Sequence, residues 1–344
     1  MKLFSGLKTR KLLKAIEKYP DIFRNYRDLI SIYLEQDKLD DARNLLNSAI
    51  SRTWDTSESA WLRIQLLRLN AQTSDNPLET MNTALDIAAD EATSITVRME
   101  AADTAATLLG KDGFEPEEEM IQRFQDVFET VINKSEDSSE KVHMLISFAS
   151  YQWQNFRRSE ASQLVVKAID TAEQVKMRHI GRVFYQGALL CRGGTVSAEK
   201  LRQWFTRGLE SGDLSDDETI NALVELAEIL QEDDDLLGAM ERYETALRFA
   251  GSRKDKSMAL TRFKLARVYF QLGRIPQAEK ETREALSGDT LTGDDRVEVL
   301  MWFARAEIEQ GHIEKASENA DEALKNAVSL ESRISVLKCQ SEIS

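Results

Sequence analysis

The sequence has 344 residues, of which 42% are hydrophobic and 30% are charged, and its formal net charge at pH 7 is −14. This hydrophobic content supports a folded core and excludes disorder as the main state, and the acidic balance makes duplex nucleic acid an unfavourable partner. The 15 glycines and 4 prolines are too few for the turn-rich connections of an all-β protein, and they favour long helices.

The first 20 residues are basic and amphipathic. Apolar and basic side chains are interleaved before the first acid, Glu17: they are Leu3, Phe4, Leu7, Leu12 and Leu13 together with Lys2, Lys8, Arg10, Lys11 and Lys14. We expect residues 1–20 to form an N-terminal helix that covers the first unit of a helical array, because the end of such an array needs a cap. The alternative is a basic helix, residues 1–18, that lies on an anionic membrane surface.

Pairs of alanines seven residues apart recur along the chain. The pairs are Ala42/Ala49, Ala161/Ala168, Ala239/Ala246, Ala278/Ala285 and Ala316/Ala323. Seven residues are about two turns of α-helix, so both alanines lie on one face, where their small side chains let a neighbouring helix approach closely. Five residues before the first alanine of four pairs stands Asp37, Asp234, Gly273 or Gly311, a residue type that tolerates the positive φ of a tight turn. Each unit is therefore predicted to be a helical hairpin.

The remaining units are predicted from weaker matches. Leu201 and Gly208 stand in place of an alanine pair, and Ala84 continues the series upstream. One further unit is expected between Ala84 and Ala168, with a long acidic turn around Gly113 and Pro116.

This pattern resembles the tetratricopeptide repeat (TPR) family, whose period is about 34 residues. The residues that match best are Tyr26, Tyr33, Ala42, Leu46, Ala49 and Ile50, and later Leu265, Ala266, Tyr269, Gly273, Ala278, Ala285 and Leu286. The resemblance implies an all-α protein, a right-handed α-solenoid of about eight TPR-like helical hairpins that forms a single domain over residues 1–344. Within it, residues 21–56 match well, residues 57–142 are degenerate, and residues 143–344 hold longer repeats and a C-terminal helix.

The sequence contains no recognisable motif for catalysis or metal binding. The histidines His143, His179 and His312 lack the HExxH spacing, and the glycine pair in "CRGGTVSAEK" lacks the GxxxxGK[ST] pattern of a phosphate loop. The acidic clusters "EPEEEM", "DLSDDE" and "QEDDDLL" lack calcium-loop spacing, and we interpret them as charge at helix N-termini. We therefore predict a protein without enzymatic activity, cofactor or metal.

Cysteine usage and hydropathy suggest a compartment. Cys191 and Cys339 lie far apart without metal-ligand spacing, which is typical of a reducing environment. No stretch approaches the roughly 18 apolar residues that a membrane span needs, and the N-terminus lacks the apolar core of a signal peptide. We expect a cytoplasmic protein that is not inserted in a membrane.

The resemblance to TPR proteins implies a scaffold or adaptor that receives a peptide or helix of a protein partner. The binding groove is expected on the concave surface made by the first helix of each hairpin, and the candidate residues there are Arg24, Arg27, Glu35, Asn221, Glu228, Gln231, Phe263, Arg267, Phe270, Gln271, Met301, Arg305 and Glu309. Phe263 and Phe270 have an alternative role, packing between successive hairpins. The alternative functions are a regulatory sensor that binds a signalling peptide and an adaptor that touches a membrane through residues 1–18.

Overall fold

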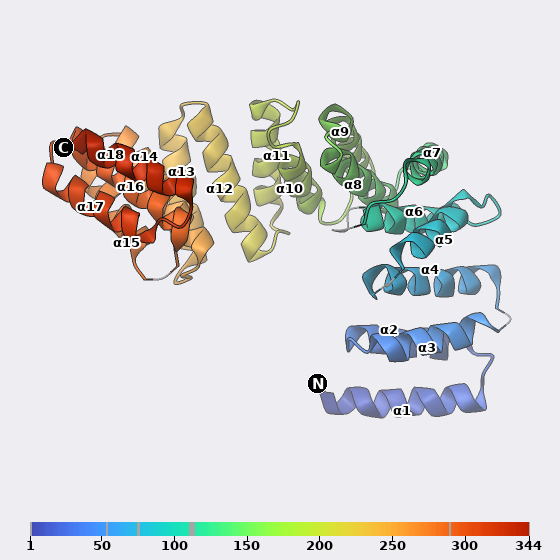
Figure 1. Ribbon diagram of the computed structural model, residues 1–344. Helices are drawn as coiled ribbons and strands as arrows, with labels where there is room; N and C mark the ends of the chain where they lie inside the picture. Colours follow the sequence, from blue (N-terminus) through green and yellow to red (C-terminus); the bar gives the residue numbers. More distant parts are fainter. Residues whose placement is uncertain (1, 53, 74–75, 110–113, 289, 344) are drawn as a thin grey trace. The chain divides into compact units, whose positions relative to one another are not determined.

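The computed structural model describes residues 2–52, 54–73, 76–109, 114–288 and 290–343, without the side chains of residues 2–7, 56–57 and 342–343. This part of the chain contains eighteen α-helices and no strand (Figure 1). The all-α prediction is confirmed. Gly113 of the predicted acidic turn lies outside the described residues, and so do the side chains of Leu3, Phe4 and Leu7.

The chain divides into two compact units. The first comprises Met1–Arg178 and Leu189–Val196, and the second comprises His179–Ala188 and Ser197–Ser344. The prediction of a single domain over residues 1–344 stays a prediction. The helices that lie wholly in the first unit are α1 (Lys2–Lys18), α2 (Phe23–Glu35), α3 (Leu39–Ile50), α4 (Thr56–Thr73), α5 (Pro77–Ala89), α6 (Ile95–Leu109), α7 (Glu118–Lys134), α8 (Ser139–Gln154) and α9 (Arg158–Gln174).

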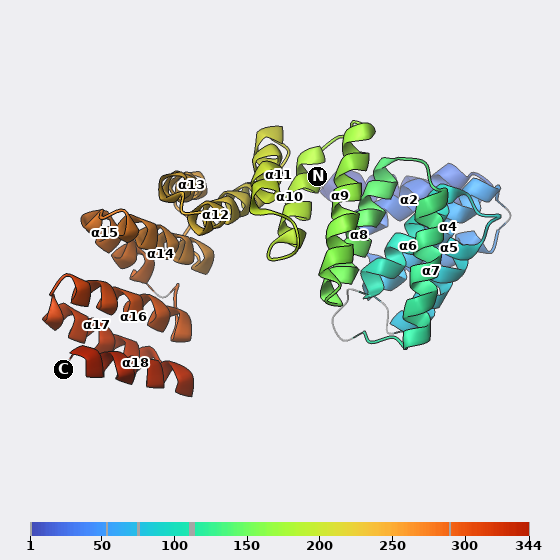
Figure 2. The same ribbon diagram turned by 90° about the horizontal axis from the view of Figure 1, so that it is seen from above.

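Helix α10 (Ile180–Cys191) contributes residues to both units. The remaining helices belong to the second unit: α11 (Ala198–Ser211), α12 (Asp216–Glu232), α13 (Leu236–Ala250), α14 (Lys256–Gln271), α15 (Ile275–Leu286), α16 (Gly293–Glu309), α17 (Ile313–Asn326) and α18 (Leu330–Ile343). Within each unit, successive helices pack as hairpins, such as α2 with α3, α8 with α9, α12 with α13, α14 with α15 and α16 with α17 (Figure 2).

The predicted turn residues have the expected backbone conformation. The φ angle is 57° at Asp37, 63° at Asp234, 72° at Gly273 and 78° at Gly311. The corresponding position in the hairpin of α8 and α9 is Phe156, whose φ is 60° and whose side chain is 85% exposed. A bulky residue in this left-handed conformation is uncommon, which is why the sequence pattern did not identify the turn.

The paired alanines form the buried helix contacts. All ten are at most 2% exposed. Gly208 takes the same role in α11, because a Cβ atom placed there would lie 3.2 Å from the carbonyl oxygen of Gly181 in α10. Small residues at these positions therefore set the distance between neighbouring helices.

The degenerate stretch between residues 57 and 142 folds into helices that pack less regularly. Helix α6 contacts α4, α5, α7 and α8 and is buried on most sides, so it lacks a simple amphipathic pattern. Arg98 of α6 is buried and donates from Nε to the carbonyl oxygen of Ala88 at 2.7 Å. The rings of Phe124 and Phe128 in α7 lie with centroids 5.6 Å and 4.5 Å from that of Phe148 in α8.

Helix α1 packs on α2, as expected of a terminal cap. Leu12 and Ile16 are partly buried against the core that contains Tyr26. On the solvent side Lys8 and Lys11 are exposed. Among the described residues, every helix is too short or too polar to cross a bilayer.

The alanine contacts make a testable prediction. Replacing Ala285 with Arg should lower the free energy of unfolding by about 2–4 kcal/mol, because a long charged side chain would enter a core formed with Ala259, Phe263 and Val299. Urea unfolding followed by circular dichroism measures the loss. The neighbouring Glu284→Arg change, at an exposed position of the same helix, is the control and should alter stability by no more than about 0.5 kcal/mol. If the two variants unfold at the same urea concentration, the prediction that Ala285 lies on the packed face is wrong.

Candidate protein-binding groove

Three first helices of the second unit, α14, α16 and α18, line one cleft of about 490 Å³. Its lining residues are Phe263 and Arg267 of α14, Asp294, Val297, Glu298, Met301, Trp302 and Arg305 of α16, and Glu331, Ser332 and Ser335 of α18. Four of the thirteen candidates named from the sequence therefore meet at one place: Phe263, Arg267, Met301 and Arg305.

The floor of the cleft is aromatic. The ring of Trp302 meets the rings of Phe263 and Phe270 edge to face, with both centroid distances at 5.6 Å. Phe263 is 4% exposed and Met301 6% exposed, whereas Trp302 is half-buried. Both phenylalanines thus pack between successive hairpins, which was the alternative interpretation, and of the two aromatic residues that line the cleft Trp302 is the more accessible. The sequence analysis missed Trp302, although it directly follows the candidate Met301.

The rim of the cleft carries two exposed arginines. The guanidinium carbon of Arg267 lies 5.8 Å from the centroid of the Phe263 ring, in the range of a cation–π contact. In the described part of the chain, no carboxylate forms an ion pair with Arg267 or Arg305. Both cations are therefore available to an acidic ligand.

The part of the cleft at the beginning of α16 is acidic. Asp294 accepts hydrogen bonds from the backbone N–H groups of Val328 and Ser329 at 3.4 Å and 3.5 Å. A hydrogen bond from the Ser332 side chain, together with these backbone donors, holds the pKa of Asp294 below its ordinary value. The carboxylate therefore stays charged and links the beginning of α16 to the beginning of α18.

Other candidates connect neighbouring first helices. Glu228 of α12 forms an ion pair with Lys264 of α14, and Gln231 Nε2 donates to Gln271 Oε1 at 3.2 Å. Asn221 Nδ2 donates to the hydroxyl oxygen of Tyr185 at 2.9 Å. These side chains lie on the helices expected from the sequence, but they are engaged within the protein. They brace the row of first helices on which the cleft lies.

The remaining candidates lie outside the cleft. Glu309 is exposed at the end of α16. Arg24, Arg27 and Glu35 belong to α2 in the first unit and are exposed, and each of the two arginines has its Nε 3.9 Å from a carboxylate oxygen of Asp28. The structure does not bring these four residues to the cleft of the second unit.

The first unit contains a cleft that the sequence analysis did not identify. It has a volume of about 610 Å³ and lies among α3, α4 and α5, with Arg43, Arg63 and Asn70 among its lining residues. Arg43 donates to Thr73 Oγ1. The residues belong to the degenerate stretch or adjoin it, where the repeat pattern offered no register from which to place them.

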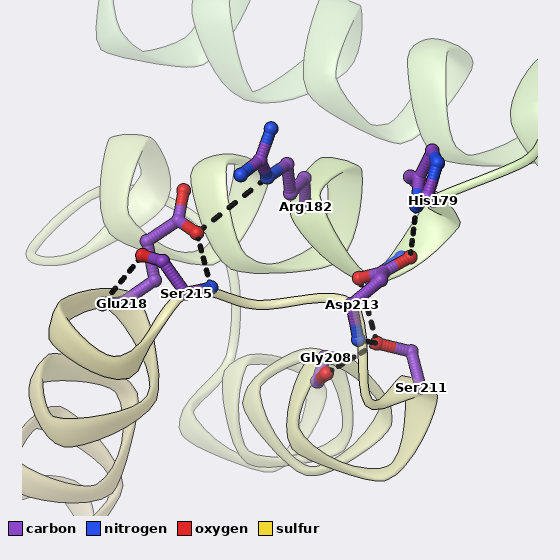
Figure 3. Close-up of polar contacts among 8 residues, drawn as sticks. His179, Arg182, Gly208, Ser211, Asp213, Ser215 and Glu218 are labelled. Atoms are coloured by element: carbon purple, nitrogen blue, oxygen red, sulfur yellow. Dashed lines mark hydrogen bonds and ion pairs between the residues drawn. The ribbon is translucent and has the colours of Figure 1, made fainter. Parts of the chain in front are cut away.

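The acidic segment before α12 forms a helix cap (Figure 3). The N–H of Glu218 donates to Ser215 Oγ at 3.3 Å, and the N–H of Ser215 donates to Glu218 Oε2 at 2.7 Å, which is a capping box. Arg182 of α10 adds an ion pair, with Nε 3.5 Å from Glu218 Oε2. The interpretation of "DLSDDE" as charge at a helix N-terminus is confirmed.

Asp213 makes a second polar junction beside this cap (Figure 3). Its carboxylate accepts from Ser211 Oγ at 2.8 Å and from the N–H of Gly181 at 3.3 Å, and His179 Nδ1 lies 3.8 Å away. His179 is exposed and has a φ of 58°. In the part of the chain that the structure describes, no three His, Cys, Asp or Glu side chains are grouped as a metal site would require.

The sequence analysis also considered two further histidines, the two cysteines and the glycine pair as candidates for chemistry, and their places in the fold are as follows. His312 Nδ1 lies 2.7 Å from Oε2 of the buried Glu307, and His143 is exposed on α8. Cys191 and Cys339 are buried and do not form a disulfide. The glycine pair after Cys191 lies between α10 and α11.

Comparison with known proteins shows which solved structures have a similar fold. No protein-family model matches the sequence, and no curated protein matches it. The apo form of the quorum sensor NprR from B. thuringiensis is similar in structure, with a TM-score of 0.55 and 14% identity over 95% of this chain and 81% of that one. A STAND (signal transduction ATPase with numerous domains) protein with a tetratricopeptide repeat sensor, from Pyrococcus horikoshii, gives a TM-score of 0.53 and 12% identity over 98% of this chain.

The alignment spans only 52% of the Pyrococcus chain. At these identities the similarity concerns the fold alone. The structure is that of an array of TPR-like helical hairpins, and the resemblance inferred from the sequence is confirmed.

The capping box predicts a dependence of stability on pH. The hydrogen bond from the backbone of Ser215, with Ser215 Oγ and Arg182, lowers the pKa of Glu218 from its ordinary 4.5. Because the folded state has the lower pKa, this stabilisation is complete above pH 4.5 and is lost as the pH falls through the folded-state value. Glu218→Gln should therefore flatten the fall of the melting temperature between about pH 5 and pH 3.

Two further variants complete this test. Ser215→Ala should cost about 1 kcal/mol at pH 7, as expected for loss of an N-cap. Asp216→Asn removes an exposed charge from the same helical turn and should leave the shape of the pH profile unchanged. A Glu218→Gln profile that parallels that of the wild type would contradict the assignment.

Proposed function

We propose that the protein is a non-catalytic scaffold or adaptor that binds a peptide or helix of a protein partner in the cleft formed by α14, α16 and α18. The observation that carries this proposal is the combination, in one cleft, of an accessible Trp302 on a buried aromatic floor with Arg267 and Arg305, which have no carboxylate partner among the described residues. Trp and Arg are the side chains that most often dominate the binding energy of protein interfaces.

The chemistry of the cleft defines the ligand. An apolar side chain fits over Trp302, and an acidic side chain close to it in the ligand can pair with Arg267 or Arg305. Glu298 and Glu331 favour a basic group elsewhere along the ligand. Because the whole chain carries a formal charge of −14, these local cations determine the orientation of an acidic ligand more than its overall attraction.

A regulatory sensor is the second candidate. Two of the solved structures that are similar in fold are a quorum sensor and a protein with a tetratricopeptide repeat sensor, which supports a signalling peptide as the ligand of the same cleft. A scaffold forms a stable complex with a folded protein, whereas a sensor binds a short peptide. Contact of residues 1–18 with a membrane surface, and the cytoplasmic location, stay predictions.

Site-specific cross-linking distinguishes the two functions. A photoreactive amino acid at Glu298 or at Ser335, two exposed residues that line the cleft, is compared with one at the exposed Arg242 of the second helix α13. We expect cross-links from the first two positions and not from the third, and mass spectrometry of the product tells a protein from a peptide. Equal cross-linking from Arg242 would contradict a groove on the first helices.

The arginines generate a quantitative prediction. Arg267→Glu combined with Arg305→Glu should weaken binding of the cross-linked partner by about 2 kcal/mol or more, while the melting temperature stays near that of the wild type because both side chains are exposed. Titration calorimetry measures the affinity.

The matched control is Arg242→Glu combined with Arg248→Glu, which makes the same charge change on α13. Phe270 is left intact in these variants because it packs against Trp302 and the core of α12 to α14, so its removal would also reduce stability. Unchanged affinity in the Arg267 and Arg305 variant would disprove the proposed contact.

A further inference from the structure

The C-terminal helix α18 exposes an apolar stripe. Leu330 is 74% exposed, Ile334 45% and Leu337 54%, and their spacing of four and three residues places them on one face of the helix. Val328, just before the helix, is 76% exposed. We refer to Leu330, Ile334 and Leu337 as the α18 stripe. Contiguous apolar patches of this kind are costly to leave in water and mark interaction sites.

The opposite face of α18 fixes the helix in place. Val336 and Cys339 are buried in a core shared with α16 and α17. Gln340 Nε2 donates to Asp321 Oδ1 of α17 at 2.7 Å, and Arg333 Nε donates to the carbonyl oxygen of Ala327 at 3.2 Å. The stripe is therefore the outward face of a firmly docked helix.

Helix α18 takes the position of a first helix in the repeat. Each preceding first helix of the second unit packs against the helix that follows it, α12 against α13, α14 against α15 and α16 against α17. Helix α18 lies beside α16 and α17 as the next first helix (Figure 2). Within the described residues, no following helix covers its outward face.

The charges beside the stripe are self-complementary. Glu331 and Lys338 are exposed, lie seven residues apart and therefore occupy the same flank of the stripe. When two copies of a helix pack antiparallel about a two-fold axis, identical flanks meet with their order reversed. Glu331 of one copy then faces Lys338 of the second copy, and the reverse pair forms as well. In a parallel two-fold pair the same flank of each copy would lie on opposite sides of the interface, so Glu331 and Lys338 would not face each other.

We propose that α18 is a self-association surface through which two copies of this chain form a two-fold symmetric dimer with antiparallel α18 helices. With Glu331 level with Lys338 of the second copy, the two-fold axis passes between Ile334 and Ser335. In this register the residues of the two α18 stripes alternate along the contact. Both stripes are removed from water, and the interface is isologous, which gives a closed dimer.

The first experiment measures the molecular mass of the full chain by sedimentation equilibrium over a range of concentrations. We expect the mass to approach twice the 39.1 kDa of one chain. Ile334→Glu combined with Leu337→Glu should raise the dissociation constant at least about a hundredfold, because two apolar contacts are lost in each copy. Leu237→Glu is the control, since Leu237 is 55% exposed on α13, outside the stripe.

Circular dichroism and the melting temperature of the monomeric state show that the variants are folded. A wild-type chain that stays monomeric up to its solubility limit overturns the proposal. A dimer that survives the Ile334 and Leu337 substitutions overturns it too, because association would then use another surface.

The second experiment tests the antiparallel register. Glu331→Lys or Lys338→Glu alone should weaken the dimer roughly fivefold, because each change replaces two attractive contacts with two repulsive ones. Combining the two substitutions in one chain should restore wild-type affinity, since the lysine introduced at position 331 of each copy would again face a glutamate at position 338 of the other. Loss of affinity that is additive in the double variant overturns the antiparallel arrangement.

Discussion

Close contact between helices at small residues is the constraint on which the rest of this structure depends. A hairpin such as α14 with α15 has one packed face, and alanines at positions 278 and 285 allow its neighbours to come close enough to exclude water. Gly208 shows how narrow the tolerance is, because even a methyl group there would press on a carbonyl oxygen of α10. A single hairpin cannot bury its apolar surface, so the units stack, and stacking is what gives the protein a continuous core.

Stacking also creates the proposed functional surface. Within the second unit the first helices form a row, and side chains about one repeat apart meet across it, as Gln231 does with Gln271. Where this row reaches α14, α16 and α18, aromatic packing around Trp302 leaves a cleft whose rim carries two arginines that no carboxylate of the described residues pairs with. The same geometry leaves the last described helix half covered, which is the origin of the α18 stripe. Binding in the cleft involves Glu331, Ser332 and Ser335 of that helix, and self-association involves the α18 stripe with Glu331 and Lys338 on its flank, so the two surfaces meet at Glu331.

The sequence pattern of the repeat is absent where a helix or turn packs differently from its counterparts in the other hairpins. Helix α6 is surrounded by four other helices, so its sequence is apolar on most sides and carries no clear period. The turn before α9 places Phe156 in a conformation that favours glycine. Fold similarity at 12% and 14% identity shows that this architecture accepts wide sequence variation. The individual side chains of the cleft, and not the fold, therefore have to account for the choice of ligand.

The sequence by itself determined the local features of this protein. The spacing of alanines and the turn residues Asp37, Asp234, Gly273 and Gly311 predict helical hairpins, because helix periodicity and tight turns depend on residues close together in the chain. It also placed Arg267 and Arg305 on first helices. Only the tertiary structure decided which candidates are accessible: Phe263 is buried in the floor of a cleft, and Glu228 is paired with Lys264. It also placed Trp302, which was not a candidate, where the cleft leaves it partly accessible. These outcomes depend on partners in the next hairpin, and the angle at which two hairpins pack is set by the whole interface between them and not by any short segment.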